Sequence, residues 1–289
     1  MDSLVSVVIP VYNAEDYISE TIKSVQEQNY NHWELIIVND GSIDNTREII
    51  DGMKEKDDRI KIFNKSNTGV SDSRNKGADI ATGDYLCFLD SDDIFLRDNL
   101  KKKATFLDQN PKIGLVHANI ELINKYGDSL GESLKGKTGN ILDSLLLWED
   151  VNIPAPSSIM VRKTVFENAG KWDVQFSTAA DQDFFIRVAA MTPIGAIDET
   201  LTQYRVLEQS MSRNISIMEK DHIGVYQKAR RLGLFRSFWF KQRCFSNLYL
   251  ILAGSWWKNG SDKLRGLYFI LKALLYYPLN MKKLIVKFF

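Results

Sequence analysis

The first 95 residues alternate short apolar stretches with segments of helical periodicity, and this alternation limits the possible folds of the chain. The segment that follows Asn13 carries apolar residues at helical spacing, and we expect Asn13 to cap this first helix. A second helix is expected after Asn45 and a short polar one after Gly69. Four stretches between these segments are rich in β-branched or aromatic residues and too short for helices: 5–11, 33–38, 60–63 and 85–89. Strands and helices that alternate in this way predict an α/β fold, with a mainly parallel sheet covered by helices on both faces.

Polar turns follow three of the predicted strands. They are Tyr12-Asn13, Asp40-Gly41-Ser42 and Asp90-Ser91-Asp92-Asp93. Open α/β sheets bind ligands beyond the carboxyl ends of their strands, where such turns meet. The three turns therefore predict one ligand site at this edge of the sheet.

The turn after the fourth strand places three carboxylates, Asp90, Asp92 and Asp93, in four positions. So much negative charge beside a buried strand is unfavourable unless a cation or several donors neutralise it. Mg²⁺ and Mn²⁺ bind carboxylate oxygens and often share their coordination with a substrate's phosphates. A polar loop in which Asp93 caps the next helix is the alternative interpretation.

Other motifs exclude several classes of protein. No Gly-x-Gly-x-x-Gly follows the first strand and no Gly-Lys-Ser/Thr occurs, which argues against a dinucleotide site and against a P-loop. Cys87 and Cys244 have no metal-ligand spacing and favour a reducing compartment. The three histidines are scattered, and the first residues do not have the pattern of a signal peptide.

Residues 96–213 predict further elements of both kinds. We expect helices over 96–110, 141–148 and 163–169 and one that begins near Asp181, with strands at 113–123, 157–161, 194–197 and 202–206.

The last seventy residues differ in charge from the rest of a chain whose formal net charge is zero. Residues 220–289 carry fourteen Lys or Arg and two acidic residues, a net charge of +12, so residues 1–219 carry −12. Apolar stretches at 248–257 and 267–279 are shorter than the roughly 20 residues of a membrane span. Basic helices with aromatic faces indicate attachment to an anionic membrane surface, and packing on the same protein or on a second subunit is the main alternative. Nucleic-acid binding is not expected, because no known module accompanies the charge.

Five segments, taken together, carry a resemblance. They are Val5–Asn13, Trp33–Ser42, Asn67–Gly77, Leu89–Asp93 and the run 180–187, Ala-Asp-Gln-Asp-Phe-Phe-Ile-Arg. In this order and spacing they resemble the family-2 glycosyltransferases of GT-A fold, over residues 4 to about 213. The resemblance implies a Rossmann-like, mixed but mainly parallel sheet in a catalytic domain at 1–215. Its nucleotide-binding half would be 1–95 and its acceptor-side half 96–215, followed by a helical extension at 216–289.

The resemblance also implies roles for residues in these segments. Asp92 would bind Mn²⁺ or Mg²⁺ between two phosphates, with Asp90 on the ribose or metal side. Asp181 would remove the proton of the acceptor hydroxyl, although Ala180 replaces the family's preceding Glu. The remaining nucleotide-binding residues would be Pro10, Tyr12 and Asp40 around base and ribose, Arg74 near base or diphosphate, and Ser91.

A second departure concerns the family's Tyr-Arg-x-His segment, in which Leu207 stands where His is expected. Since Leu binds no cation, we expect weaker metal affinity; either Asp92 and the phosphates hold the metal, or Arg205 and Arg213 share the phosphate charge. Trp172 matches a family position near the acceptor, where it would stack on a sugar or lie in the core.

The resemblance implies a metal-dependent, inverting glycosyltransferase that uses a nucleotide-sugar, most simply a UDP-sugar. Its acceptor would be a saccharide or a lipid-linked molecule in cell-surface polysaccharide or glycolipid synthesis, at the cytoplasmic face of the membrane. The alternatives are a nucleotidyltransferase and a catalytically degenerate membrane scaffold of the same fold. A homo-oligomer is compatible with the sequence.

Overall fold

The computed structural model describes residues 3–207, 214–258, 260 and 262–280. Its strands form one sheet in the order β3-β2-β1-β4-β8-β6-β9-β5, with β7 paired to β6. The strands are β1 (Val5–Val11), β2 (Trp33–Asn39), β3 (Ile60–Asn64), β4 (Tyr85–Phe88), β5 (Ile94–Phe95), β6 (Leu115–Ile123), β7 (Ser129–Leu134), β8 (Ile159–Arg162) and β9 (Ile194–Arg205).

The first four strands are parallel to one another, as the sequence predicts. β1 lies between β2 and β4, and Val8 is opposite Ile36 on one side and Phe88 on the other. All residues of β1, β2 and β4 are buried, because helices cover both faces of the sheet. Since β1, β2 and β4 run in one direction, the turns that follow them lie at one edge of the sheet.

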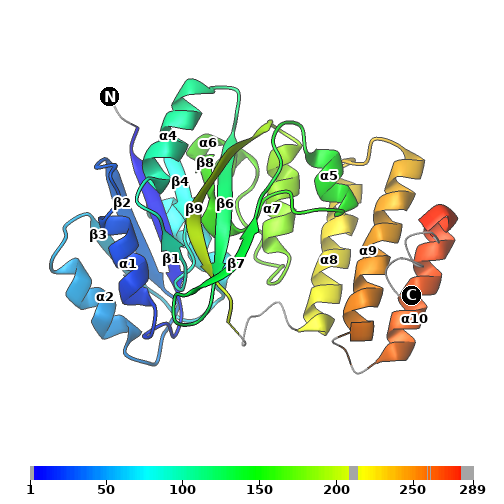
Figure 1. The fold of residues 1–289 in the computed structure, drawn as a ribbon, viewed down its shortest axis with the longest axis horizontal. Coiled ribbons are helices and arrows are strands. Elements are labelled where there is room, and N and C mark those ends of the chain that lie inside the picture. Colours follow the sequence, from blue (N-terminus) through cyan, green and yellow to red (C-terminus); the bar gives the residue numbers. More distant parts are fainter. Residues whose placement is uncertain (1–2, 208–213, 259, 261, 281–289) are drawn as a thin grey trace.

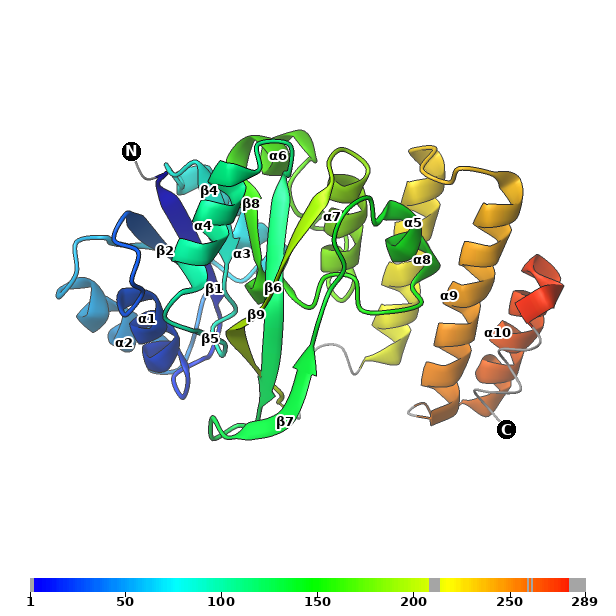
Figure 2. The same cartoon turned by 45° about the horizontal axis from the view of Figure 1, so that its top comes forward.

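Helices cover the two faces in separate groups (Figures 1 and 2). One group packs on the face of Val7 and Ile9, and the other packs on the face of Val8 and Phe88. The first comprises α1 (Ile18–Gln26), α2 (Thr46–Lys54) and α4 (Asn99–Gln109); the second comprises α3 (Val70–Ile80), α6 (Lys163–Asn168) and α7 (Ala180–Ala189).

The second half of the sheet is mixed and departs from the prediction in three places. β8 is antiparallel to both β4 and β6, and β6 is parallel to β9. Residues 194–205 form one continuous strand rather than two, with register shifts opposite Ala118 and Asn119. The short β5 and the mostly exposed β7 were not expected, because neither has an apolar pattern of its own.

Two predicted helix starts are wrong. α1 begins at Ile18, and Asn13 has φ 48° and accepts a hydrogen bond from the Ile43 backbone N–H at 2.9 Å. Asn13 therefore joins the turns after β1 and β2 rather than capping a helix. α4 begins at Asn99, so Asp93 is not its cap.

The C-terminal helices α8 (Ile215–Arg231), α9 (Phe238–Lys258) and α10 (Lys263–Tyr276) continue the molecule in a row beyond α7 (Figure 1). Their buried side chains, which include Tyr226 and Phe269, belong to the same cluster as Phe184 of α7. The Tyr226 hydroxyl donates to the carbonyl of Leu146 in α5 (Leu142–Leu147) at 2.7 Å. These helices thus pack against α5 and α7. Within the described residues, no helix is long and apolar enough to cross a membrane.

Candidate active site

Asp93 is a structural residue in the acidic turn after β4. It is buried, and its carboxylate accepts hydrogen bonds from the hydroxyl of Ser157 and from the Arg205 backbone N–H at 3.0 Å. These bonds tie the turn to β9 and to the segment before β8. Burial and the neighbouring carboxylates Asp92 and Asp90 raise the pKa of Asp93 well above its ordinary value, despite the two bonds.

Arg74 neutralises the first carboxylate of the turn. Its guanidinium is paired with Asp90 and lies 5.0 Å from the ring centroid of Trp172. Arg74 is buried rather than solvated on the helix surface. Trp172 is also buried, in contact with Phe88 and Phe184, and is a core residue rather than an exposed stacking surface.

Asp92 lacks the partners that Asp90 and Asp93 have. It is half-buried, and among the described residues no other residue forms a hydrogen bond or ion pair with its carboxylate. Burial and the nearby charge of Asp90 raise its pKa to about 6. Both causes disfavour the ionised form of the Asp92 carboxyl, and a bound cation would favour that form.

The donor set fits a cation that is only partly held by protein. Asp90 and Asp92 supply hard oxygen donors, which suit Mg²⁺ or Mn²⁺. The described part of the chain has no group of three His, Cys, Asp or Glu side chains that could hold a metal ion. Phosphate oxygens and water would therefore complete the coordination, as is common for Mg²⁺.

The turn after β2 is built around Asp40. Its buried carboxylate accepts hydrogen bonds from the backbone N–H groups of Thr68 and Gly69, both at 2.9 Å, and from the Lys65 ammonium. These bonds hold the loop before α3 against the end of β2. The other residues of this edge differ in exposure: Pro10 is buried, Tyr12 is 47% exposed, and Ser91 is half-buried with its carbonyl accepting from the Thr21 hydroxyl at 2.9 Å.

Asp181 lies in the first turn of α7, where its carboxylate accepts from the Gln182 backbone N–H at 2.7 Å. Burial raises its pKa, and the charges of His222 and Arg74 act in the opposite direction. Arg74 therefore interacts electrostatically with carboxylates from both halves of the chain, Asp90 and Asp181. Asp183 instead forms an ion pair with Arg187 at 2.6 Å and takes no part in this group.

Arg205 is not available to a phosphate in this structure. Its guanidinium donates to the carbonyls of Asp92, Asn124 and Lys125 and pairs with Glu20 at 2.7 Å, with 1% of its side chain exposed. The prediction that it shares the phosphate charge is therefore wrong. Arg213 lies outside the described residues, and Leu207 is half-buried at the end of the described segment.

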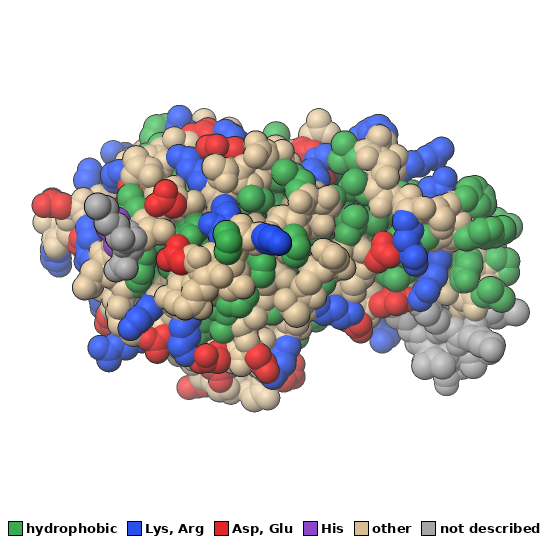
Figure 3. Space-filling view, turned by 90° about the horizontal axis from the view of Figure 1, so that it is seen from above, with side chains coloured by type: hydrophobic (Ala, Val, Ile, Leu, Met, Phe, Trp, Pro, Cys, Tyr) green, Lys and Arg blue, Asp and Glu red, His purple; other side chains and the backbone are tan. Residues whose placement is uncertain are grey.

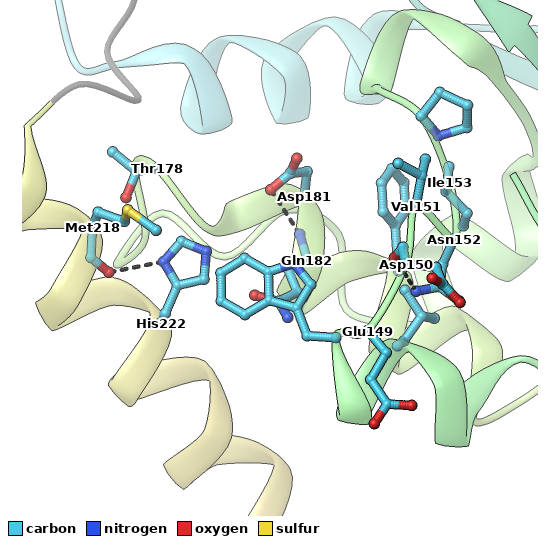
Figure 4. A pocket seen from close by; sticks show the side chains of 14 residues that line it. Glu149, Asp150, Val151, Asn152, Ile153, Thr178, Asp181, Gln182, Met218 and His222 are labelled. Carbon is cyan, nitrogen blue, oxygen red and sulfur yellow. Dashed lines mark hydrogen bonds between the residues drawn. The ribbon is translucent and has the colours of Figure 1, made fainter. Parts of the chain in front are cut away.

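Three side chains near these carboxylates were not predicted from the sequence. Tyr204 has its pKa raised by burial and by Asp93, Asp90, Asp92 and Asp181, so it stands among them. Trp148 and His222 line a cavity of about 660 Å³ together with Asp181 (Figure 4). His222 lies in α8, beyond the segment that carries the resemblance, and no local pattern distinguishes it.

Comparison with known proteins gives the family. Residues 6–170, more than half of the chain, match the model of glycosyl transferase family 2. An uncharacterized glycosyltransferase of Rickettsia conorii is 32% identical over 206 residues, which are 71% of this chain and 33% of the relative. The chain thus spans about a third of that relative's length.

Two further relatives have more specific names. The putative teichuronic acid biosynthesis glycosyltransferase TuaG of Bacillus subtilis is 31% identical over 82% of this chain and 92% of its own length. The UDP-Glc:alpha-D-GlcNAc-diphosphoundecaprenol beta-1,3-glucosyltransferase WfgD of Escherichia coli is 40% identical over 43% of this chain and 48% of WfgD.

Solved structures show the same fold. TarS of S. aureus in complex with UDP-GlcNAc aligns with 99% of this chain and 76% of its own, with a TM-score of 0.59 and 18% identity. The mannosyltransferase PcManGT of Pyrobaculum calidifontis, with GDP-Man and Mn²⁺, aligns with 98% of this chain and 83% of its own, with a TM-score of 0.61 and 16% identity. With the predicted sheet, the acidic turn after β4 and the family match in agreement, the chain belongs to glycosyl transferase family 2 and has the GT-A fold.

Proposed function

We propose that this protein transfers a sugar from a nucleotide-sugar to an acceptor hydroxyl, with inversion and with the help of a divalent cation. One observation carries the proposal: Arg74 pairs with Asp90 and also acts on Asp181. The acidic turn and Asp181, the carboxylate expected to act as base, therefore interact with the same cation, Arg74. A donor's diphosphate at the turn would have its anomeric carbon between the two sets of residues.

The chemistry assigns a different task to each carboxylate. Asp90 and Asp92 would hold the cation, which would offset the negative charge that develops on the departing diphosphate. Asp181 takes the proton from the acceptor hydroxyl as the oxygen attacks the anomeric carbon. Burial raises the pKa of Asp181, and a carboxylate with a raised pKa is a stronger base. A single displacement of this kind inverts the anomeric centre.

The donor and acceptor classes are proposed from the relatives' names. WfgD uses a UDP-sugar and a diphosphoundecaprenol-linked acceptor, TuaG is assigned to teichuronic acid biosynthesis, and TarS was solved with UDP-GlcNAc. We therefore propose a UDP-sugar donor and a saccharide or lipid-linked acceptor in cell-surface polysaccharide or glycolipid synthesis. Family membership favours this function over nucleotidyl transfer.

The surface of α10 supports attachment to a membrane surface, which for an enzyme that uses a nucleotide-sugar we propose to be the cytoplasmic face. Its outward face carries five apolar side chains at helical spacing, the most exposed of which is Leu275 at 83%: Leu264, Leu267, Tyr268, Leu271 and Leu275. We call these five residues the α10 stripe. Figure 3 shows hydrophobic side chains gathered at this end of the molecule, with Lys and Arg side chains beside them. Apolar and cationic groups together suit an anionic lipid surface.

A binding screen and a turnover assay test the proposed function. UDP-glucose, UDP-N-acetylglucosamine and GDP-mannose are tested with and without Mn²⁺, and stabilisation of the folded protein by one of them is expected. Release of nucleoside diphosphate is then measured for the wild type, Asp181→Asn and Asp198→Asn. Asp198, an exposed carboxylate on β9 paired with Lys135, is the control. If no nucleotide-sugar binds or turns over, the degenerate scaffold becomes the better interpretation.

A further inference from the structure

The cavity beside Asp181 is closed on one side by a stacked pair of rings. The planes of Trp148 and His222 lie 4.4 Å apart between centroids, at an angle of 10°. Trp148 follows α5 and has φ 49°, a left-handed conformation that is unfavourable for a bulky residue. The packing that holds Trp148 in this conformation also fixes the plane of the His222 ring.

The backbone of α8 determines which nitrogen of His222 carries the proton. Nδ1 lies 2.8 Å from the carbonyl oxygen of Met218. A carbonyl oxygen only accepts, so Nδ1 must be the donor, and in the neutral ring Nε2 then carries a lone pair. No hydrogen bond to Nε2 is found within the described residues. Figure 4 shows the Nε2 edge of the ring turned toward the side of the cavity where Asp181 lies.

A second contact holds α8 against the start of α7. The carboxylate of Asp221, next to His222, accepts from the backbone N–H groups of Ser177 and Thr178, both at 2.8 Å. These residues lead directly into the turn that carries Asp181. The distance between the helix of His222 and the turn of Asp181 is thus maintained by partly buried hydrogen bonds.

Among the described residues, the charged groups that act on His222 are Asp181 and Asp221, and the two other carboxylates of the cavity are paired, Glu149 with Arg243 and Asp150 with Lys137. Asp181 comes from α7, Asp221 from α8 itself, and Glu149 and Asp150 line the same cavity after α5. Burial lowers the pKa of His222, whereas the Met218 bond, Asp181 and Asp221 act to raise it. Asp181 and His222 thus each favour the charged form of the other.

We propose that His222 is a positioning residue for Asp181 and shares with it the proton removed from the acceptor. The proposal rests on the function proposed above. As the acceptor O–H bond breaks, its electron pair forms the bond to the anomeric carbon, and the pair of the bond to the diphosphate leaves with the β-phosphate. The proton goes to a carboxylate oxygen of Asp181 and then to Nε2 of His222, which returns it to water after the product leaves. A helix outside the family-matched segment thus completes the proton-accepting group.

The first test needs no turnover. The pKa values of the three histidines are measured by NMR in the wild type and in Asp181→Asn, and the His222 signal is assigned by its loss in His222→Phe. We expect the His222 pKa to fall by at least half a unit in Asp181→Asn, because a neighbouring negative charge is lost. In Asp198→Asn it should not change. An unchanged His222 pKa in Asp181→Asn overturns the proposal.

The second test uses nucleoside diphosphate release from a donor that the binding screen identifies, with water as the acceptor and Mn²⁺ present. In His222→Phe, which keeps a ring against Trp148, we expect kcat to fall by about tenfold or more, with the donor KM unchanged and the acidic limb of the pH profile displaced. In His222→Ala, added imidazole should restore part of the lost rate, whereas it should not restore Asp181→Asn. His32→Phe, at the opposite edge of the sheet, is the control.

The two proposals fail in different ways. If the wild type binds no nucleotide-sugar, the proposed function fails, and the NMR titration still decides whether His222 and Asp181 interact. If the wild type turns over and His222→Phe has the same kcat and pH profile, only the role of His222 is lost. Thermal unfolding of each variant identifies a change caused by misfolding, and His222→Gln then replaces His222→Phe.

Discussion

At the scale of single residues, three neighbouring aspartates of the acidic turn have three different environments. Asp93 is buried between two donors, Asp90 is paired with Arg74, and the carboxylate of Asp92 has no partner among the described residues. The side chains are chemically identical, so only their surroundings distinguish Asp93, a structural residue, from Asp90 and Asp92, the candidate cation ligands.

The first prediction concerns Asp92. Since Leu207 stands where the family often has a His ligand, Asp92 carries much of the proposed cation binding, and Asp92→Asn should lower Mn²⁺-dependent nucleoside diphosphate release by at least about 100-fold. Mn²⁺ affinity in the presence of UDP should fall with it, as measured by calorimetry. Asp198→Asn is the matched control. Wild-type Mn²⁺ affinity in the Asp92 variant would contradict the assignment.

The second prediction concerns pH-dependent stability at Glu34 in β2. Burial raises the pKa of this carboxyl, but hydrogen bonds from Lys61, Ser6 and Thr82 outweigh burial and lower it from 4.5 to about 2. The resulting stabilisation is therefore complete above pH 4.5 and is lost as the pH falls toward 2. At pH 7, Glu34→Gln should lower the free energy of unfolding by about 1–3 kcal/mol. Urea unfolding at several pH values should show this difference shrinking in acid, and a constant difference would refute the explanation.

At the scale of elements, Arg205 ties the end of β9 to elements that are distant in the sequence. The Arg205 guanidinium bonds to the turn after β4, to the turn between β6 and β7, and to Glu20 of α1. One side chain thus joins two turns and a helix at the site edge of the sheet.

The third prediction follows from this arrangement. Arg205→Lys retains the charge but cannot reach all these acceptors at once, so we expect a loss of about 2–4 kcal/mol in the free energy of unfolding. Arg47→Lys, an exposed residue 3.8 Å from Asp51, should change stability by less than about 0.5 kcal/mol. Equal effects in urea unfolding would show that Arg205 is not a structural clamp.

Elements with a pattern of their own could be predicted from the sequence, and elements without one could not. β1 to β4 are apolar runs between turn residues, and each was found within a residue or two of its observed bounds. β5 has two residues and β7 is polar, so both exist because β9 and β6 offer them backbone partners. Asn is a residue type that often caps helices, but the hydrogen bond that Asn13 accepts from the turn after β2 determines its conformation.

At the scale of the whole molecule, the C-terminal helices have one face in the core and another exposed. α8 and α9 bury residues such as Tyr226 and Leu248 in the core shared with α5 and α7, as the packing alternative predicts, and α10 packs on α9. The α10 stripe remains exposed among the described residues.

The fourth prediction concerns this stripe. The double variant Leu267→Ser and Leu271→Ser should bind vesicles of phosphatidylglycerol and phosphatidylcholine about tenfold more weakly or worse, because it lacks two exposed Leu side chains that would insert into the lipid. Nucleoside diphosphate release in solution should be unchanged. Salt should weaken the wild-type binding.

The control is Leu130→Ser on β7, where Leu130 is as exposed as Leu267, at 46%. A different result would contradict the prediction: the wild type forms a dimer and does not bind vesicles, and the double variant is a monomer. The stripe would then be a contact between two copies of the chain.

The sequence by itself determined the parallel half of the sheet, the edge at which its turns meet, the family and the acidic turn. Hydrophobic periodicity and turn residues are local properties, so a single strand or turn reveals them. Only the tertiary structure decided what each polar side chain contacts. The bond between Asp93 and the Arg205 N–H joins residues 112 positions apart, and Arg205 and Glu20 are 185 apart. Contacts between such distant residues give Asp92 and Asp93 different environments. The packing of α8 on α7 likewise places His222 and Asp181 in one cavity.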